Sequence, residues 1–222
     1  MISEAKLPAE LCNDANEFLP ERLTDAWLAN HGIARQTAFV YRAWLEAGGD
    51  TAVVKPHIVA WLDVRSRKPE AQFIYAAWLK AGGDRTVVQP HIVAWLGVHA
   101  TEPEAGFVYP AWLEAGGDTA VVQPHIEAWL RVHDTDSKAS FVYAAWLNAG
   151  GDRTVVQRHL EAWLQRHGRV ILARFVYQAW LESGGETATI KKYIMHWLQV
   201  NSSSPQAFYL RKTWENAIRT GV

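Results

Sequence analysis

Histidine recurs at one position of a repeated pattern, and this is the feature of the sequence that comes nearest to a chemical site. The column consists of His57, His91, His125 and His159, with Tyr193 at the fifth position. Imidazole binds zinc and transfers protons, so such a column raises the question of a metal or catalytic centre. Equivalent positions of stacked helical hairpins lie roughly 10 Å apart, whereas zinc ligands lie about 2.1 Å from one shared ion. We therefore expect no metal, and we interpret these histidines as core residues that each make a hydrogen bond.

Two further patterns that resemble chemical motifs have structural explanations. A second histidine column falls at predicted helix C-termini, where an imidazolium suits the helix dipole: His31, His99, His133 and His167. A Gly-Gly pair followed by Asp or Glu recurs five times without the Lys-Ser/Thr that a phosphate loop requires. The chain has one cysteine, and no nucleophile is paired with a base. We expect no enzyme activity, no metal and no cofactor.

Tryptophan shows how the chain is organised. Its 12 residues recur at every seventeenth position from Trp27 to Trp214, and a fixed period is typical of repeat proteins. Five units of 34 residues, each with two tryptophans, follow one another without a gap: residues 39–72, 73–106, 107–140, 141–174 and 175–208. We interpret residues 1–38 as a degenerate N-terminal cap unit and residues 209–222 as a C-terminal cap helix. The prediction is a single repeat domain over residues 1–222.

Each unit is predicted to form two helices. In residues 107–140 the first half has apolar residues on nearly all sides, with only Pro110 and Glu114 outside the apolar arc. We expect this helix to be buried nearly all round, Phe107 included. The second half is amphipathic, and its predicted buried face consists of Val121, Val122, His125, Ala128, Trp129 and Val132.

The connections agree with two helices per unit. The Gly-Gly pair supplies the positive φ that ends a helix, and the following Asp is suited to cap the next one. Proline occurs within three of the second helices, at Pro56, Pro90 and Pro124, and predicts a kinked or delayed helix start. Buried indole N–H groups need acceptors, and we expect the first column of histidines and tyrosine to provide them.

These patterns predict an all-α protein, a right-handed α-solenoid of five 34-residue helical hairpins between N- and C-terminal capping helices. In period and in helix-turn-helix unit the chain resembles tetratricopeptide repeats in architecture. It lacks their consensus, since Ala-Trp-Leu recurs in both helices and Gly-Gly lies in the turn between them. The glycine turn and the proline of the second helix are also similar to the repeats of transcription-activator-like effectors, which read DNA, but the residues that read bases are absent.

Function is expected where the units differ, because a varied surface on a constant frame is typical of a modular binding protein. The varied positions that should face solvent are the predicted contact sites: Val59, Val93, Glu127, Glu161, Met195, Arg42 and Arg131. Val59, Val93 and Met195 are apolar on a solvent-facing side, which makes them the strongest candidates. We predict a non-enzymatic scaffold for a protein or peptide partner, as the adaptor or sensor part of a larger assembly.

Charge indicates further partners. Residues 1–152 carry 12 Lys and Arg against 19 Asp and Glu, whereas residues 153–222 carry 10 against 4. Basic residues of the second segment, Arg166 and Arg169 among them, suit nucleic acid, an acidic partner, or head-to-tail self-association with the acidic segment of another copy. The net charge of −1 weakens modular nucleic-acid binding as an alternative function. The near-identity of the units leaves a third interpretation, a consensus-designed or recently amplified scaffold without an evolved ligand.

The start of the chain has no basic segment followed by an apolar run. No stretch approaches the ~20 apolar residues that a membrane span needs. We therefore expect a cytoplasmic protein without a membrane partner.

Overall fold

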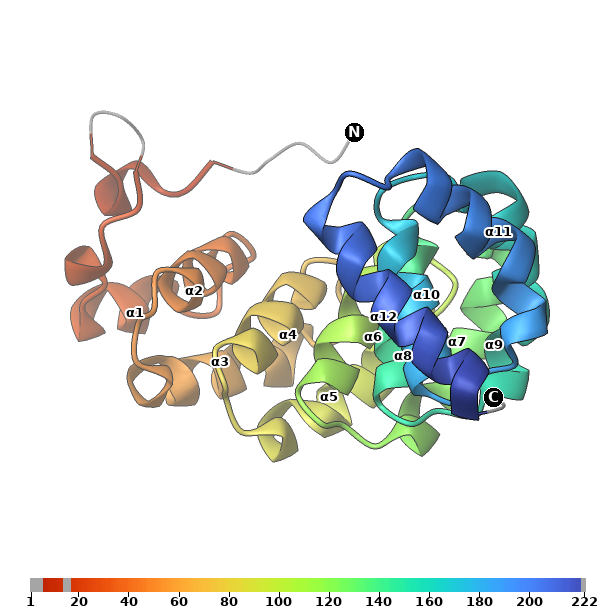
Figure 1. Cartoon of the computed structure of the whole chain (residues 1–222). Coiled ribbons are helices and arrows are strands. Elements are labelled where there is room, and N and C mark those ends of the chain that lie inside the picture. The colour runs from red at the N-terminus through yellow and green to blue at the C-terminus, as the bar shows by residue number, and fades with distance from the viewer. Residues whose placement is uncertain (1–5, 14–16, 221–222) are drawn as a thin grey trace. The chain divides into compact units, whose positions relative to one another are not determined.

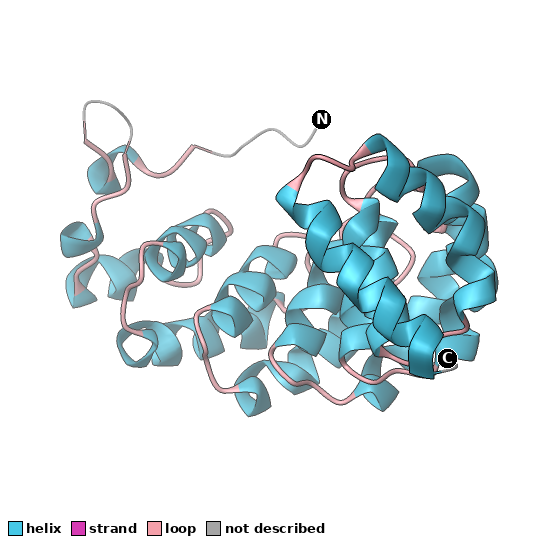
Figure 2. Cartoon of the chain, viewed as in Figure 1, coloured by secondary structure: helices cyan, strands magenta, loops and turns pink. Residues whose placement is uncertain are grey.

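The computed structural model describes residues 6–13 and 17–220, and over these residues the chain is all-α (Figure 1). Figure 2 shows helices and connections in this part of the chain, whose one β-type pairing is an antiparallel bridge between Cys12 and Phe18. The described helices are η1 (Ala9–Leu11), η2 (Pro20–Arg22), α1 (Asp25–His31), α2 (Thr37–Glu46), α3 (Thr51–Arg65), α4 (Ala71–Lys80), α5 (Arg85–His99), α6 (Ala105–Glu114), α7 (Thr119–His133), α8 (Ala139–Asn148), α9 (Arg153–His167), α10 (Ala173–Glu182), α11 (Thr187–Val200) and α12 (Pro205–Thr220), where η marks a 3₁₀ helix. The outermost parts of the two predicted caps lie outside the described residues.

The chain divides into two compact units, residues 1–99 and 100–222. In the first unit α2 packs against α4, α3 packs against both, and α5 packs against α4. In the second unit α6, α8, α10 and α12 pack in succession, and so do α7, α9 and α11. Figure 1 shows α12 in dark blue, and this helix packs on α10 and α11. Within each unit, successive helices therefore bury their apolar faces against their neighbours in the sequence.

Two kinds of helix alternate along the chain. The helices α2, α4, α6, α8 and α10, called first helices here, have 10 residues each. The second helices α3, α5, α7 and α9 have 15 residues each, and α11 has 14. A first helix and the second helix after it make one hairpin. The C-terminal helix α12 begins at Pro205, earlier than the predicted residue 209.

Proline does not set where a second helix begins. The helices α3, α5 and α7 contain an internal proline, whereas α9 and α11 do not, and all five begin in the same register after the glycine turn. The predicted delay of the helix start is therefore wrong. Pro56, for example, is the sixth residue of α3, so it removes one hydrogen bond after the first turn has already been capped.

The glycine turn joins each first helix to its second helix, as α4 and α5 illustrate. Gly82 has a φ of +74°. Its backbone N–H donates to the Leu79 carbonyl at 3.1 Å, and the backbone N–H of Gly83 donates to the Trp78 carbonyl at 2.9 Å. This is the Schellman pattern that ends a helix. A Cβ on Gly83 would lie 2.3 Å from the Trp78 indole, so the second glycine makes room for a ring that covers the turn.

Where the residue after the glycines is an aspartate, it caps the second helix, as predicted, whereas Glu186 makes no side-chain cap hydrogen bond at the start of α11. The Asp84 carboxylate accepts hydrogen bonds from the hydroxyl and the backbone N–H of Thr86, at 2.8 and 2.9 Å. These two bonds lower the pKa of the Asp84 carboxyl, the hydroxyl bond more than the backbone bond. The equivalent aspartates cap the backbone in the same way: Asp50, Asp118 and Asp152.

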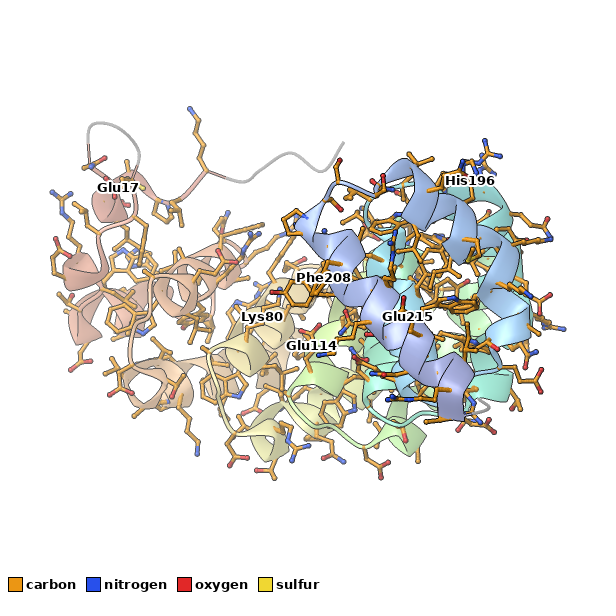
Figure 3. The ribbon with its side chains drawn as sticks, viewed as in Figure 1. Glu17, Lys80, Glu114, His196, Phe208 and Glu215 are labelled. Carbon is orange, nitrogen blue, oxygen red and sulfur yellow. The ribbon has the colours of Figure 1, made fainter. Side chains whose placement is uncertain are left out.

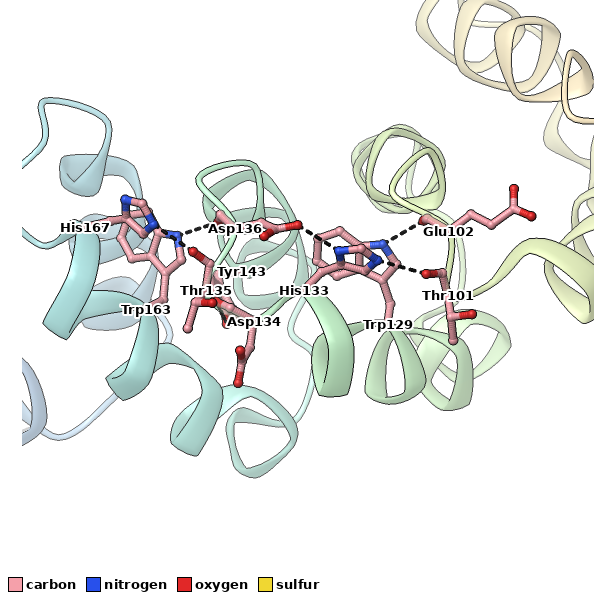
Figure 4. Close-up of polar contacts among 10 residues, drawn as sticks. All are labelled: Thr101, Glu102, Trp129, His133, Asp134, Thr135, Asp136, Tyr143, Trp163 and His167. Atoms are coloured by element: carbon pink, nitrogen blue, oxygen red, sulfur yellow. Dashed lines mark hydrogen bonds and ion pairs between the residues drawn. The ribbon is translucent and has the colours of Figure 1, made fainter. Parts of the chain in front are cut away.

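Three backbone carbonyls in the connection between hairpins are held by side chains (Figure 4). Between α7 and α8 these are the carbonyls of residues 134–136. Tyr143 Oη donates to the first at 2.9 Å, His167 Nε2 bonds the second at 2.7 Å, and Trp163 Nε1 donates to the third at 2.9 Å. Because a carbonyl oxygen only accepts, the histidine carries its proton on Nε2. All three side chains belong to the following hairpin, so these bonds fix one hairpin on the next.

The arrangement recurs at the other connections. The tyrosines and tryptophans that repeat it are Tyr41, Tyr75, Tyr109 and Tyr177, and Trp61, Trp95, Trp129 and Trp197. His99 and His133 make the histidine bond. Arg65 takes the same place earlier in the chain and donates from Nε to the Ile33 carbonyl at 2.8 Å. The position therefore requires an N–H donor rather than a histidine.

The prediction that the first histidine column accepts the indole N–H groups is wrong. Backbone carbonyls accept them, either in the glycine turn, as for Trp78, or in the connection before the hairpin, as for Trp163. The column is instead half-buried, apart from His159, which is buried with Nδ1 2.9 Å from Asp134 Oδ2. Burial lowers the pKa of the His125 imidazole. The wider expectation for tryptophan holds, because the nine from Trp61 to Trp197 are at most 1% exposed.

The two glycines of a turn predict different costs for the same substitution. Gly82→Ala places a side chain at positive φ in open space, which should cost about 1 to 2 kcal/mol. Gly83→Ala drives a Cβ into the Trp78 ring, and displacing a packed ring should cost about 3 kcal/mol. Urea unfolding of the two variants checks this order, and a Gly83→Ala protein as stable as the wild type would contradict the assigned role.

The buried tyrosines predict a loss of stability in alkali. Burial raises the pKa of the phenols that bond the connections: Tyr41, Tyr75, Tyr109, Tyr143 and Tyr177. Above about pH 10 the unfolded chain loses these protons and the folded chain keeps them, so stability falls by about 1.4 kcal/mol per pH unit for each tyrosine. Urea unfolding between about pH 9 and about pH 11 measures this slope. Tyr143→Phe should reduce the slope by one tyrosine's share, and an unchanged slope would count against the assignment.

Candidate binding surface

The phenylalanine near the start of α6, α8 and α10 is exposed, although the sequence predicts burial for Phe107, whereas the equivalent Phe39 and Phe73 of α2 and α4 are half-buried. Phe107, Phe141 and Phe175 are 49%, 50% and 42% exposed, whereas Val108 and Tyr109, next to the first of them, are fully buried. A first helix is covered by its second helix and by the first helices beside it, and one side remains open. Phe107 and Glu114 lie seven residues apart, two helical turns, and so share that side. The exposed rings therefore form a column across the layer of first helices.

A hollow follows this column over α6, α8 and α10. It holds about 430 Å³. Phe141 and Phe175 line it near the beginnings of α8 and α10, and Glu114, Asn148 and Glu182 line it at the ends of the three helices. Glu114 is labelled in Figure 3, and it is exposed, as are Asn148 and Glu182. Small alanine side chains form much of the remaining lining, which is why the hollow exists between closely packed helices.

Cationic side chains lie over several of these rings. Lys138 Nζ is 4.7 Å from the centre of the Phe107 ring, and the Arg174 guanidinium is 4.3 Å from that of Phe175. In the first unit the Arg42 guanidinium is 5.5 Å from the centre of the Phe73 ring. The negative face of an aromatic ring attracts such cations. This surface of the molecule therefore already binds positive charge intramolecularly.

The residues predicted from sequence variation fall on two different layers. Arg42 belongs to a first helix, where it pairs with Glu46 at 2.9 Å and covers Phe73. The others belong to second helices or to the connection after α9: Val59, Val93, Glu127, Arg131, Glu161, Arg166, Arg169 and Met195. Within the second layer, Val93 and Met195 are 43% and 52% exposed, whereas Val59 and Glu127 are half-buried. Within the first unit, Arg42 belongs to a first helix, whereas Val59 and Val93 belong to second helices.

A second hollow lies between α11 and α12, and it contains one predicted residue. Met195, Trp214 and Ile218 line it together with charged Arg211 and Glu215, and its volume is about 590 Å³. Figure 3 labels Glu215 and Phe208 on α12, and the Phe208 side chain is 68% exposed. This end of the chain thus also exposes apolar surface.

The predicted buried face of the second helices is partly wrong. Val132 was expected in the core but is 61% exposed, and its equivalents Val64 and Val98 are 63% and 61% exposed. Each of these valines lies one residue before the histidine or arginine that bonds the preceding connection. That bond turns its own side of the helix inward, and the neighbouring position on the helix then faces solvent.

The phenylalanine column had a signal in the sequence. Pro110, one of the two positions predicted to face solvent, is buried, so that prediction is wrong, whereas Glu114 is exposed as predicted. Phe107 precedes Glu114 by seven residues, and seven residues bring side chains to the same face of a helix. Helical geometry therefore places the phenylalanine on the solvent-facing side, although its apolar character favours the core.

The described residues contain neither a candidate metal-binding cluster nor a helix that could span a membrane. Within this part of the chain, no group of three or more His, Cys, Asp or Glu side chains could hold a metal ion. No described helix combines the length and the apolar character needed to cross a membrane. The pairs Asp136 with His133 and Asp134 with His159 each serve a connection between hairpins.

Comparisons with family models, with curated proteins and with solved structures find no match to this chain. The class of protein is therefore defined by the fold itself. The described residues form an all-α, helical repeat-like protein whose helices pack against their neighbours.

The exposed phenylalanines predict a small contribution to stability. Phe141→Ala removes a half-exposed ring and should cost about 1 kcal/mol or less, whereas Trp146→Ala, in the same helix, removes a fully buried ring and should cost about 3 to 5 kcal/mol. Thermal and urea unfolding of the two variants check the difference. A cost above about 3 kcal/mol for Phe141→Ala would show that the ring is a core residue.

Proposed function

We propose that this chain is a non-enzymatic repeat scaffold that binds a protein or peptide partner, as the adaptor or sensor part of a larger cytoplasmic assembly. In this proposal residues 1–222 are one repeat domain, a right-handed α-solenoid of five 34-residue hairpins with a cap at each end. Its architecture is tetratricopeptide-like, without the tetratricopeptide consensus. The sequence period, which continues without interruption from residue 39 to residue 208, supports a single domain.

The observation that carries the proposal is the column of exposed phenylalanines. Exposing Phe107, Phe141 and Phe175 has a cost in water, and nothing in the packing of the hairpins requires a ring at these positions. Contiguous exposed apolar surface with a polar rim is typical of protein interaction sites, and aromatic residues are enriched in the centres of such sites. The polar rim here is formed by Glu114, Asn148 and their neighbours at the helix ends.

Nucleic-acid binding is the second candidate function. It is favoured by the exposed Arg166 and Arg169 and by the excess of basic residues after residue 152. Self-association between the acidic and basic segments would use the same charges. A scaffold that has no evolved ligand would use neither surface.

Capture of partners from a source lysate with matched variants tests the proposal. In the first variant, Phe107, Phe141 and Phe175 are changed to Ser. In the control, the equally exposed valines of the second helices are changed to Ser: Val64, Val98 and Val132. We expect proteins that the wild type and the control retain at least about tenfold better than the phenylalanine variant, because a few buried aromatic anchors carry most of the binding energy of an interface.

Other outcomes separate the alternatives. Retained material that nuclease releases, and that the double variant Arg166→Glu, Arg169→Glu no longer retains, would establish nucleic-acid binding instead. Retention that depends on the valines and not on the phenylalanines would place the surface on the second helices. No specific retention by any form would contradict the proposal and favour the scaffold without a ligand.

A further inference from the structure

We propose that the hollow at Phe141 binds a basic segment of the partner, an extended peptide with two Lys or Arg residues three positions apart. The inference rests on the proposed binding function and names the chemistry of its ligand. Its basis is one aromatic ring without a cation, two carboxylates on the same hollow, and the distance between them.

Phe141 differs from its neighbours in the column. Lys138 covers Phe107 and Arg174 covers Phe175, whereas among the described residues no Lys or Arg lies over the Phe141 ring. The sequence explains the difference. The residue equivalent to Lys138 is Leu172, and the residue equivalent to Arg174 is Ser140. The rings at the equivalent positions, Phe107 and Phe175, each bind a cation of the chain. The Phe141 ring is therefore left open on the lining of the hollow.

The charge of the hollow matches a cationic ligand. Glu114 and Glu182 are the charged side chains among the described residues that line it, and both are negative. Gln178 Nε2 donates to Glu182 Oε1 at 2.8 Å, which holds this carboxylate in place and leaves its second oxygen for a ligand. Asn148 lies at the equivalent position of the helix between them and offers an amide to a peptide backbone. Phosphate groups would be repelled here, so the geometry favours a basic peptide over nucleic acid.

The distance between the two parts of the hollow sets the spacing of the ligand's charges. Phe141 and Asn148 are seven residues apart in α8, which is about 10 Å along the helix. In an extended peptide of the polyproline II type, residues three positions apart lie on the same side and are separated by about 9 Å. One cation can then lie over the Phe141 ring while the other meets the carboxylates of Glu114 and Glu182. Adjacent basic residues lie about 3 Å apart along the peptide and on different sides of it, so they do not match this spacing.

Two octapeptides of identical composition test the spacing. The first, Gly-Lys-Gly-Ser-Lys-Gly-Ser-Gly, has its lysines three positions apart, and the second, Gly-Lys-Lys-Gly-Ser-Gly-Ser-Gly, has them adjacent. Each carries an uncharged fluorophore, and binding to the full chain is measured by fluorescence anisotropy at low salt. We expect the first peptide to bind at least about threefold tighter, since a single exposed cation–ring contact has this effect, and both affinities to fall as salt is added.

Matched variants locate the site. Phe141→Leu keeps an apolar side chain and removes the ring face, so it should weaken the first peptide about three- to fivefold, whereas Phe208→Leu, at an exposed ring outside this hollow, should leave it unchanged. Leu172→Lys supplies the missing internal cation and should compete with the peptide. Its control is Gln206→Lys, the equivalent position for Phe175, which Arg174 already covers. Circular dichroism of each variant confirms that it is folded.

Specific results would overturn the inference. Equal binding of the two peptides, or equal effects of Phe141→Leu and Phe208→Leu, would remove the assigned ligand. Sedimentation measures whether the chain forms dimers at low salt. Dimers that the Phe141→Leu substitution dissociates would also overturn the inference, because the occupant of the hollow would then be a second copy of the chain. If the peptides fail to discriminate while protein capture still depends on the phenylalanines, the binding function stands without this ligand. If the peptides discriminate but capture is the same for all variants, the site stands and the proposed function fails.

Discussion

The fold depends on satisfying the backbone carbonyls where one helix ends and the next begins. A buried carbonyl without a donor costs about as much as a lost hydrogen bond, and the connection between α7 and α8 presents three in a row to side-chain donors of the next hairpin. Tyr143, His167 and Trp163 donate to the three carbonyls of residues 134–136. Because these donors come from both helices of the following hairpin, the same bonds that satisfy the backbone also fix the position of that hairpin on the preceding connection.

This requirement explains why the residues that recur most regularly carry no chemistry. Tryptophan, tyrosine and the second histidine column resemble ligand-binding residues in the sequence, yet most of these side chains use their polar atoms inside the fold. The arginine that replaces histidine in α3 makes the comparable bond with its Nε, so the role is donation rather than imidazole chemistry. Function is then left to positions that the connections do not use, and the open side of the first helices in the second unit is one such surface.

That open side combines apolar rings with charge. A ring exposed to water gains from a cation above it, and Lys138 and Arg174 supply that cation within the chain. Where a repeat lacks the cation, as at Phe141, the same ring remains free to bind one from outside. A small sequence difference between near-identical units thus produces a chemically distinct hollow without changing the helices that form it.

The sequence by itself determined the helices, because periodicity, the glycine turns and the aspartate caps are local properties that hydrogen bonds within a few residues satisfy. It also placed tryptophan in the core correctly. It did not determine where Trp163 finds its acceptor, since that carbonyl belongs to a connection 27 residues earlier. It also misplaced Phe107 and Val132, because apolar character predicts burial, whereas the number of neighbours around each helix decides it. Only the packing of successive hairpins shows which side of each helix remains uncovered, and that side is where binding is proposed.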